Sequence, residues 1–404
     1  MYRKKKSKLE IGINMNSSLE GLKVIDFTQV IMGPSCTAQL ADHGAEVIKI
    51  ERPEYGELTR QFGPFKDGES LPYESYNRNK KSIAVNLKSK EGKKIIYKLA
   101  SKSDVIVNNF RPGVMDSLGF SYEDLYKINK KIIYACGSGF GLSGPLKEKM
   151  GHESVAEALG GFLGKNGEKG RKPRRAPGAV ADASTGLHLT VGILLALNAR
   201  HKTGEGQVVD VSLLDSMMWM QGWEVSSASN LDQVTFNPDP LDSGVYETGD
   251  GLIVMSGLFI SNPLKNISEV IGVEDLSKDE RFKSMDDIAK NASDLLEIIQ
   301  NKIIKKDSEY WVTEFEKSNI ICSKILGMEE AINQPQIKHN KIIVEIKKKN
   351  IKRNIVGVPV RLSKTPGSIR TFPPKLGENT EEVLLSLGYK STEISDFKNK
   401  KVVE

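Results

Sequence analysis

The chain has 404 residues, of which 39% are hydrophobic and 27% charged, and its formal net charge is +6. This length leaves ample interior for two or three domains and excludes the small disulfide-stabilised proteins. Lysines are spread along the whole length, which favours solvated surface over a nucleic-acid-binding face.

The cysteines and the apolar runs indicate the cellular compartment. Cys36, Cys136 and Cys322 lie far apart, so they form neither a disulfide framework nor a metal-ligand pattern. Their use fits a reducing compartment. No apolar run is long enough for a signal peptide or a membrane span. We therefore expect a cytoplasmic protein with no membrane partner.

The first half of the chain alternates between strand and helix patterns. After a flexible polar tail over 1–18, apolar runs predict strands at 22–27, 45–50, 82–86, 104–108, 131–136 and 208–213. Helices are expected from about Ser35 and over 91–100. Such alternation predicts an open, mostly parallel, Rossmann-like α/β sheet with helices on both faces.

Basic side chains follow several of these strands. Arg52 and Lys88 come after the second and third strands, and Asn109-Phe110-Arg111 follows the fourth. The carboxyl ends of parallel strands meet at one sheet edge, where ligands bind. Cations gathered there suit a phosphate-bearing ligand, although loop Arg and Lys are also ordinary surface residues.

A glycine motif follows the strand at 131–136. Gly139, Gly141 and Gly144 match the G-x-G-x-x-G spacing, but Pro145 comes next and no acid-ended strand follows. A dinucleotide fingerprint opens directly into a helix. We therefore interpret the motif as a flexible loop over a ligand.

The segment 176–200 (APGAVADASTGLHLTVGILLALNAR) predicts a buried helix, since apolar residues occupy every face from Leu187 onward. Asp182 stands near its start, between small residues. One interpretation is an ordinary N-cap. The other is a carboxylate that a substrate can reach, kept ionised by the positive end of the helix.

The pattern changes after residue 225. We expect a first part of the large domain at 19–225, a linker at 226–244 and a smaller, mainly helical α+β domain at 245–335. A hairpin at 245–255 and amphipathic helices at 292–304 and 309–317 belong to the latter. The return over 336–404, with short strands at 355–360 and a helix at 381–387, completes the large domain from both termini.

Taken together, these segments resemble the class III CoA-transferases, the family of formyl-CoA transferase and carnitine CoA-transferase, in the superfamily that includes α-methylacyl-CoA racemase. The resemblance covers nearly the whole chain from about Leu19. It is carried by 19–27 (LEGLKVIDF), 33–34 (GP), 42–51 (DHGAEVIKIE), 109–113 (NFRPG), 138–141 (SGFG), 181–186 (ADASTG), 203–211 (TGEGQVVDV), 365–367 (TPG) and 376–380 (LGENT).

The resemblance implies that Asp182 is the nucleophile, which forms an anhydride and then an aspartyl-CoA thioester. It also implies that Arg52, Lys88 and the Asn109–Arg111 turn hold coenzyme A. The substrates would be an acyl-CoA donor and a carboxylate acceptor, without a permanently bound cofactor or a metal. The family further implies an interlocked homodimer.

Two departures and two alternatives stay open. Ser117 stands where relatives often carry an arginine, and 256–261 lacks the glycine run of the formyl-CoA branch. A racemase would use His152 and Asp182 as an acid–base pair. Its usual Asp-Phe-Gly-Gly is absent, and Ile260 stands where its glutamate is expected. A non-enzymatic, basic nucleotide- or nucleic-acid-binding protein is a remote alternative.

Overall fold

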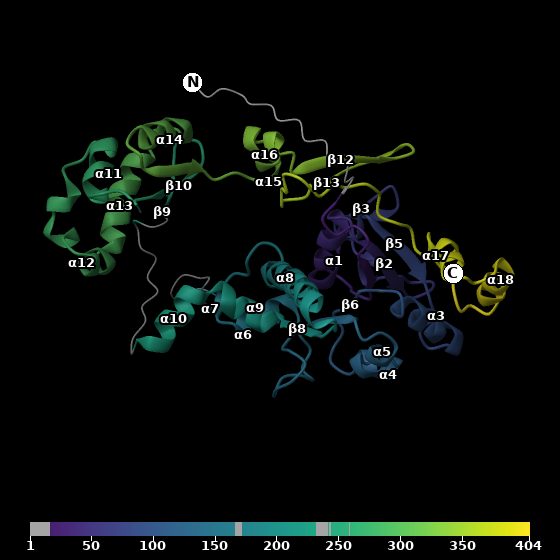
Figure 1. The fold of residues 1–404 in the computed structure, drawn as a ribbon. Coiled ribbons are helices and arrows are strands. Elements are labelled where there is room, and N and C mark those ends of the chain that lie inside the picture. Colours follow the sequence, from purple (N-terminus) through teal and green to yellow (C-terminus); the bar gives the residue numbers. More distant parts are fainter. Residues whose placement is uncertain (1–16, 166–171, 232–240, 242–243, 258) are drawn as a thin grey trace, which may run out of the picture. The chain divides into compact units, whose positions relative to one another are not determined.

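The computed structural model describes residues 17–165, 172–231, 241, 244–257 and 259–404. Most of the predicted tail (1–16) and most of the predicted linker (232–240 and 242–243) lie outside the described residues. Two compact units are present, one reaching Ser229 and including Lys341–Glu404, the other spanning Asn230–Asn340 (Figure 1).

A six-stranded sheet forms the centre of the first unit. Its strand order is β5-β2-β1-β6-β7-β8, and every neighbouring pair is parallel. This confirms the predicted open α/β sheet. The strands are β1 (Lys23–Asp26), β2 (Glu46–Glu51), β5 (Lys80–Ala84), β6 (Val105–Asn108), β7 (Ile133–Ser138) and β8 (Val208–Ser212).

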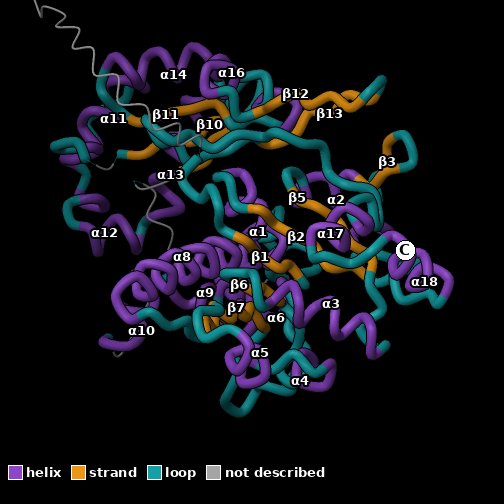
Figure 2. The backbone as a smooth tube through the Cα atoms, turned by 45° about the vertical axis from the view of Figure 1, so that its right-hand side comes forward, coloured by secondary structure: helices purple, strands orange, loops and turns teal. Residues whose placement is uncertain are grey.

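Successive residues of the central strands face opposite sides of the sheet, so the sheet has two cores. Val24, Val47 and Val105 pack against α1 (Met32–Asp42) and α8 (Val180–Thr203). Their neighbours in sequence, including Ile25 and Ile48, pack against α3 (Lys90–Ala100), α5 (Tyr122–Ile128), α17 (Thr380–Ser386) and α18 (Ser391–Asn399). Figure 2 shows strands of the sheet between these two groups of helices.

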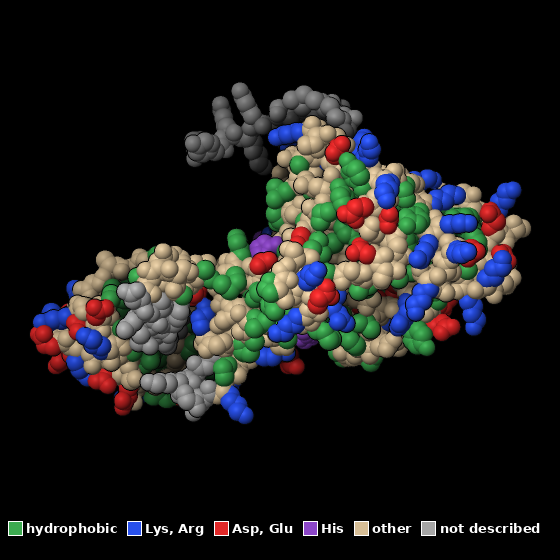
Figure 3. All heavy atoms as spheres, turned by 90° about the horizontal axis from the view of Figure 1, so that it is seen from below, with side chains coloured by type: hydrophobic (Ala, Val, Ile, Leu, Met, Phe, Trp, Pro, Cys, Tyr) green, Lys and Arg blue, Asp and Glu red, His purple; other side chains and the backbone are tan. Residues whose placement is uncertain are grey.

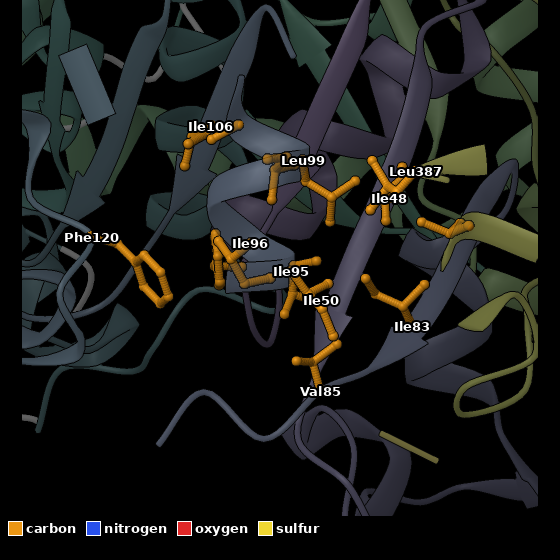
Figure 4. Close-up of a cluster of buried hydrophobic side chains, with 14 of the residues drawn as sticks. Ile48, Ile50, Ile83, Val85, Ile95, Ile96, Leu99, Ile106, Phe120 and Leu387 are labelled. Carbon is orange, nitrogen blue, oxygen red and sulfur yellow. The ribbon is translucent and has the colours of Figure 1, made fainter. Parts of the chain in front are cut away.

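Helix α3 shows how local sequence sets one of these layers. Its N-cap Ser89 accepts a hydrogen bond from the Gly92 amide at 2.9 Å, which satisfies a free donor of the first turn. Ile95, Ile96 and Leu99 recur at helical spacing and are fully or almost fully buried against the strands (Figure 4). The prediction of a helix at 91–100 is confirmed.

The end of the chain completes the first unit. Val403 forms an antiparallel bridge with Val85, and the Asn86 amide donates to the Val402 carbonyl at 2.8 Å. Helix α17 contacts β5, so segments far apart in sequence lie side by side (Figure 1). The helix predicted at 381–387 is present, whereas α18 was not predicted.

Helix α8 lies where it was predicted but differs from its prediction in burial. Leu187, Val191, Leu194 and Leu195 are exposed, so the expectation of burial on every face is wrong for the single chain. By length and composition α8 is the one helix among the described residues that can cross a membrane, but half of its most apolar stretch is buried inside the protein. The expectation that no segment is long enough for a membrane span considered only the apolar run from Leu187, whereas the helix begins at Val180.

Several short elements surround the sheet. They are the 3-10 helix η1 (Leu58–Gln61), the hairpin β3 (Phe65–Lys66) and β4 (Glu69–Ser70), and the helices α2 (Leu71–Asn77), α4 (Val114–Leu118), α6 (Glu153–Leu159), α7 (Phe162–Lys165), α9 (Leu213–Met220) and α10 (Gly222–Asn230). The return segment forms a hairpin of β12 (Ile343–Lys348) and β13 (Ile351–Val356) rather than the strands predicted at 355–360. Its many lysines hid the alternating pattern.

The second unit has a separate core. Its antiparallel sheet, in the order β11-β10-β9, contains β9 (Gly244–Glu247), β10 (Leu252–Ser256) and β11 (Ile321–Lys324). The predicted hairpin is β9–β10. The remaining elements are α11 (Pro263–Ile271), η2 (Leu276–Lys278), η3 (Glu280–Phe282), α12 (Met285–Lys290), α13 (Ala292–Ile303), α14 (Ser308–Lys317), α15 (Met328–Ala331) and α16 (Pro335–Asn340). Leu295, Ile299 and Phe315 are fully buried in its core.

Charged side chains of both signs share the surface. On the face seen in Figure 3, Lys and Arg side chains lie among acidic and apolar ones. The three cysteines are buried and free.

Candidate functional site

A buried ionic cluster fixes the turn that follows β1. Asp26 accepts hydrogen bonds from the Thr28 amide at 2.8 Å, the Thr37 hydroxyl at 2.7 Å and Lys80 Nζ at 3.0 Å. Burial alone would raise the pKa of Asp26, but Lys49, Lys80 and the hydroxyl donors lower it to about 2. Asp26 is therefore a charged anchor for the turn.

The next two residues of the turn are held from neighbouring elements. The Asn109 side chain accepts from the Gln29 amide and donates to the Gln29 carbonyl, each at 2.8 Å. Val30 has φ of 68°, which is costly for a β-branched residue, and its amide donates to Glu57 at 2.9 Å. The backbone of this turn is thus fixed on both sides.

This turn borders a cavity of about 460 Å³ at the carboxyl edge of the sheet. Arg52, Lys88 and Lys401 supply positive charge around an apolar floor, and the Arg52 guanidinium lies over the Tyr55 ring at 4.7 Å. The lining residues are Phe27, Gln29, Ile50, Glu51, Arg52, Pro53, Glu54, Tyr55, Val85, Asn86, Leu87, Lys88, Phe110, Leu118 and Lys401.

The structure brings together some of the predicted residues and separates others. Arg52, Lys88 and Phe110 share the cavity wall, whereas Asn109 and Arg111 are not part of it. Asn109 supports the wall from behind through Gln29, and Arg111 is exposed. Lys401 escaped the sequence analysis because only the pairing of the last residues with the segment after β5 brings it to this edge.

Asp182 lies in the first turn of α8, but it is not the N-cap. That position belongs to Ala179, whose side chain makes no capping hydrogen bond. Glu153, at the start of α6, caps the helix instead, since its carboxylate accepts from the amides of Ala181 at 2.9 Å and Asp182 at 2.6 Å. The N-cap interpretation of Asp182 is wrong, and Glu153 was missed because the capping residue comes from another helix.

This arrangement sets the acidity of Asp182. Burial raises the pKa of Asp182, and the negative charge of Glu153 raises it further, to about 7. We expected the helix end to favour the ionised form of Asp182, but the amides of Ala181 and Asp182 bond to Glu153 instead. Among the described residues, no hydrogen bond or ion pair reaches the Asp182 carboxylate oxygens.

Two further elements border the start of α8. Tyr76, on α2, is close enough for the Asp182 charge to raise the pKa of its phenol, after the larger effect of burial. At Gly186 helix α1 comes so near that an added Cβ would lie 2.7 Å from the Met32 carbonyl oxygen. The turn beside the cavity leads directly into α1, so α1 connects the cavity wall to the Asp182 helix.

His152 precedes Glu153 and is exposed. A hydrogen bond of 3.2 Å joins its Nδ1 to the Ser154 hydroxyl. The side chain that bonds to the Asp182 backbone amide is that of Glu153, the residue after His152. Where an arginine was expected, Ser117 is exposed and donates to the Val114 carbonyl at 2.7 Å.

Comparison with known proteins decides the class of this site. The model of CoA-transferase family III matches residues 19–380. The chain belongs to CoA-transferase family III. It is thus an enzyme that transfers CoA between an acyl-CoA and a carboxylate.

Relatives and solved structures agree with this family. Human succinyl-CoA:glutarate CoA-transferase is 33% identical over 379 residues, which cover 92% of this chain and 86% of the relative. Formyl-CoA:oxalate CoA-transferase of Escherichia coli O157:H7 is 32% identical, covering 95% and 99%. A crystal structure of a CAIB/BAIF family protein from Brucella suis matches with a TM-score of 0.80 at 28% identity, covering 92% and 100%.

The raised pKa of Asp182 makes a testable contribution to stability. The folded-state pKa of about 7 exceeds the usual value of 3.8, so between these values only the unfolded chain ionises, and stability falls as pH rises. Asp182→Asn lacks this penalty. At pH 8 we expect its free energy of unfolding, measured by urea titration, to exceed that of the wild type by on the order of 2–4 kcal/mol. At pH 4 we expect little gain.

The control is Asp116→Asn, which changes an exposed aspartate of α4. The difference in free energy of unfolding between this variant and the wild type should be the same at pH 4 and pH 8. An Asp182→Asn difference that does not change with pH would contradict the proposed cause.

Proposed function

We propose that Asp182 is the nucleophile of the CoA transfer. The observation that supports this most directly is a partly buried carboxylate without a bonded cation or donor among the described residues, at the head of α8. A carboxylate removed from water and left unpaired is more reactive than one held in an ion pair. Its raised pKa still leaves it mostly ionised above pH 7.

The reaction then has four balanced steps. The Asp182 carboxylate attacks the thioester carbon of the donor. CoA thiolate departs, and a mixed anhydride of Asp182 and the donor acid remains. The thiolate attacks the Asp182 carbonyl carbon, which releases the donor acid and forms an aspartyl-CoA thioester. The acceptor carboxylate attacks that thioester and again releases CoA thiolate. Finally the thiolate attacks the acceptor's carbonyl, forming the new acyl-CoA and regenerating Asp182.

The cavity at the sheet edge is our proposed site for the nucleotide part of CoA. Arg52, Lys88 and Lys401 supply the charges that phosphate groups need. Phe110 and the apolar floor suit a base. The exposure of these cations keeps them hydrated until the ligand arrives, which favours capture of an anion over structural ion pairing.

The relatives guide the choice of substrates. The activities in their names join succinyl-CoA with glutarate and formyl-CoA with oxalate. We propose that this enzyme also takes a short dicarboxylate, and these four compounds form the first panel to test. If CoA is transferred to no acid in this panel, the proposal of a dicarboxylate substrate is contradicted. The proposal that Asp182 is the nucleophile is not affected.

We also propose that two copies of the chain associate through α8. Leu187, Val191 and Leu195 form an exposed stripe at the four-residue spacing of one helix face. On α9, Trp219 continues the stripe, since its ring lies 4.8 Å from that of His188. A contiguous apolar stripe of this kind marks an interaction surface, and the family resemblance implies a second copy as its partner.

The first prediction of this proposed function concerns the covalent intermediate. Brief incubation with a reactive acyl-CoA should add the mass of CoA to the wild-type chain, and hydroxylamine should remove it. Asp182→Asn should form no adduct and lose activity by a factor of about 10³ or more, because the nucleophile is absent. Intact-mass spectrometry measures the adduct, and an adduct of the same size on the variant would exclude Asp182.

The second prediction concerns the cavity. Lys88→Ala and Lys401→Ala should each raise KM for the acyl-CoA about 3- to 10-fold with little change in kcat, because a phosphate contact is lost. Lys94→Ala, which changes an exposed lysine of α3, is the matched control. Where the lost partner is the 3′-phosphate, the same variant should show no KM penalty with a dephospho-CoA donor. Unchanged KM in both cavity variants would remove CoA from this site.

The third prediction concerns assembly. Leu187→Glu combined with Leu195→Glu should convert a dimer into a monomer, because charges cannot be buried in an apolar interface without partners. Light scattering after size-exclusion chromatography measures the mass. Leu385→Glu, at an exposed leucine of α17, should leave the dimer intact. A wild-type protein that is already a monomer would contradict the proposal.

A further inference from the structure

A second buried acid lies behind the group that caps α8. Glu157 is one turn after Glu153 on α6, so the two side chains share a helix face. Glu157 is fully buried, and neither of its carboxyl oxygens has a hydrogen-bond donor among the described residues. Among the described residues, the cation that pairs with Glu157 is Arg175, a half-exposed side chain whose Nε is 3.5 Å from Glu157 Oε2. A buried carboxylate in such a place is costly.

The cost disappears if Glu157 carries a proton. Glu153 and Glu157 lie one helical turn apart on the same face of α6, which allows a hydrogen bond between their carboxyl groups, and such a bond exists only when one of them is protonated. Both Glu153 oxygens already accept from backbone amides, one from Ala181 and the other from Asp182, so Glu153 is the acceptor of the pair. The proton therefore belongs on Glu157, whose O–H can donate to Glu153.

We propose that Glu157 keeps this proton and donates it to Glu153, so that the two carboxyl groups together fix the first turn of α8 and the direction of Asp182. Glu157 is then a positioning residue, and the inference rests on the proposed role of Asp182 as nucleophile. Loss of the proton at high pH would place two negative charges side by side beneath the helix and disturb the turn.

The surrounding charges agree with this assignment. Burial raises the pKa of Glu157, Arg175 opposes this rise, and the charge of Glu153 adds to it. The neighbouring elements hold their own ionised groups in separate contacts. On α7, Lys165 pairs with Glu224 at 3.1 Å, and at α9 Asp215 accepts from the Ser212 hydroxyl at 2.7 Å. From α8, Asp182 adds a further negative charge beside Glu153.

The test measures the rate of CoA-adduct formation on Asp182 from pH 6 to pH 10 in rapidly quenched intact-mass experiments. We expect the wild-type rate to fall about tenfold per pH unit on the alkaline side. Glu157→Gln has a permanent N–H donor, so it should stay within about threefold of the wild-type maximum and lose the alkaline fall. Glu157→Leu, which has no donor, should be at least tenfold slower throughout, with unchanged KM for the acyl-CoA.

A second variant keeps the test independent of the folding of Glu157→Leu. Arg175→Gln removes the cation that opposes protonation, so the alkaline fall should move to higher pH. The same alkaline fall in Glu157→Gln as in the wild type would overturn the proposal. So would a Glu157→Leu rate equal to that of the wild type. Failure of the proposed function is distinguishable, because the wild type would then form no adduct at any pH.

Discussion

The start of α8 depends on one carboxylate that comes from another helix. Ala179 offers no cap, so the first free amides of a 24-residue helix need an acceptor from elsewhere, and Glu153 supplies it at 2.6 and 2.9 Å. Because Glu153 takes these donors, the Asp182 side chain receives no compensation for its burial. The capping contact thus positions the proposed nucleophile, and the charge of Glu153 adds to the rise in the pKa of Asp182 that burial causes.

The proposed binding cavity and the proposed nucleophile have opposite electrostatic surroundings. Lys88 and Lys401 are exposed and hydrated, which suits the capture of a large anion. Asp182 is withdrawn from water and unpaired, which suits attack on a thioester. The rigid turn after β1, anchored by Asp26, leads from the cavity into α1, and α1 touches α8 at Gly186. Helix α1 therefore connects the cavity wall to the helix that carries Asp182.

Much of the fold and part of the site were predictable from sequence. The central strands were recognised because they are buried on both faces and carry mostly apolar runs, as at 22–27 and 104–108. Arg52, Lys88 and Phe110 were found because the ends of parallel strands meet at one edge. Helix α6 was missed because it is short and its acids resemble surface charges, although Glu153 and Glu157 are buried.

The sequence by itself determined the alternation of strands and helices, the edge at which the cavity lies and the family of the enzyme, since all three follow from local patterns. Only the tertiary structure decided which residues meet across long separations. Lys401 reaches the cavity through pairing of the last residues beside β5, and Glu153 reaches Asp182 across 29 positions. The pKa of Asp182 follows from burial and a neighbouring charge, which depend on distances in space rather than on order along the chain.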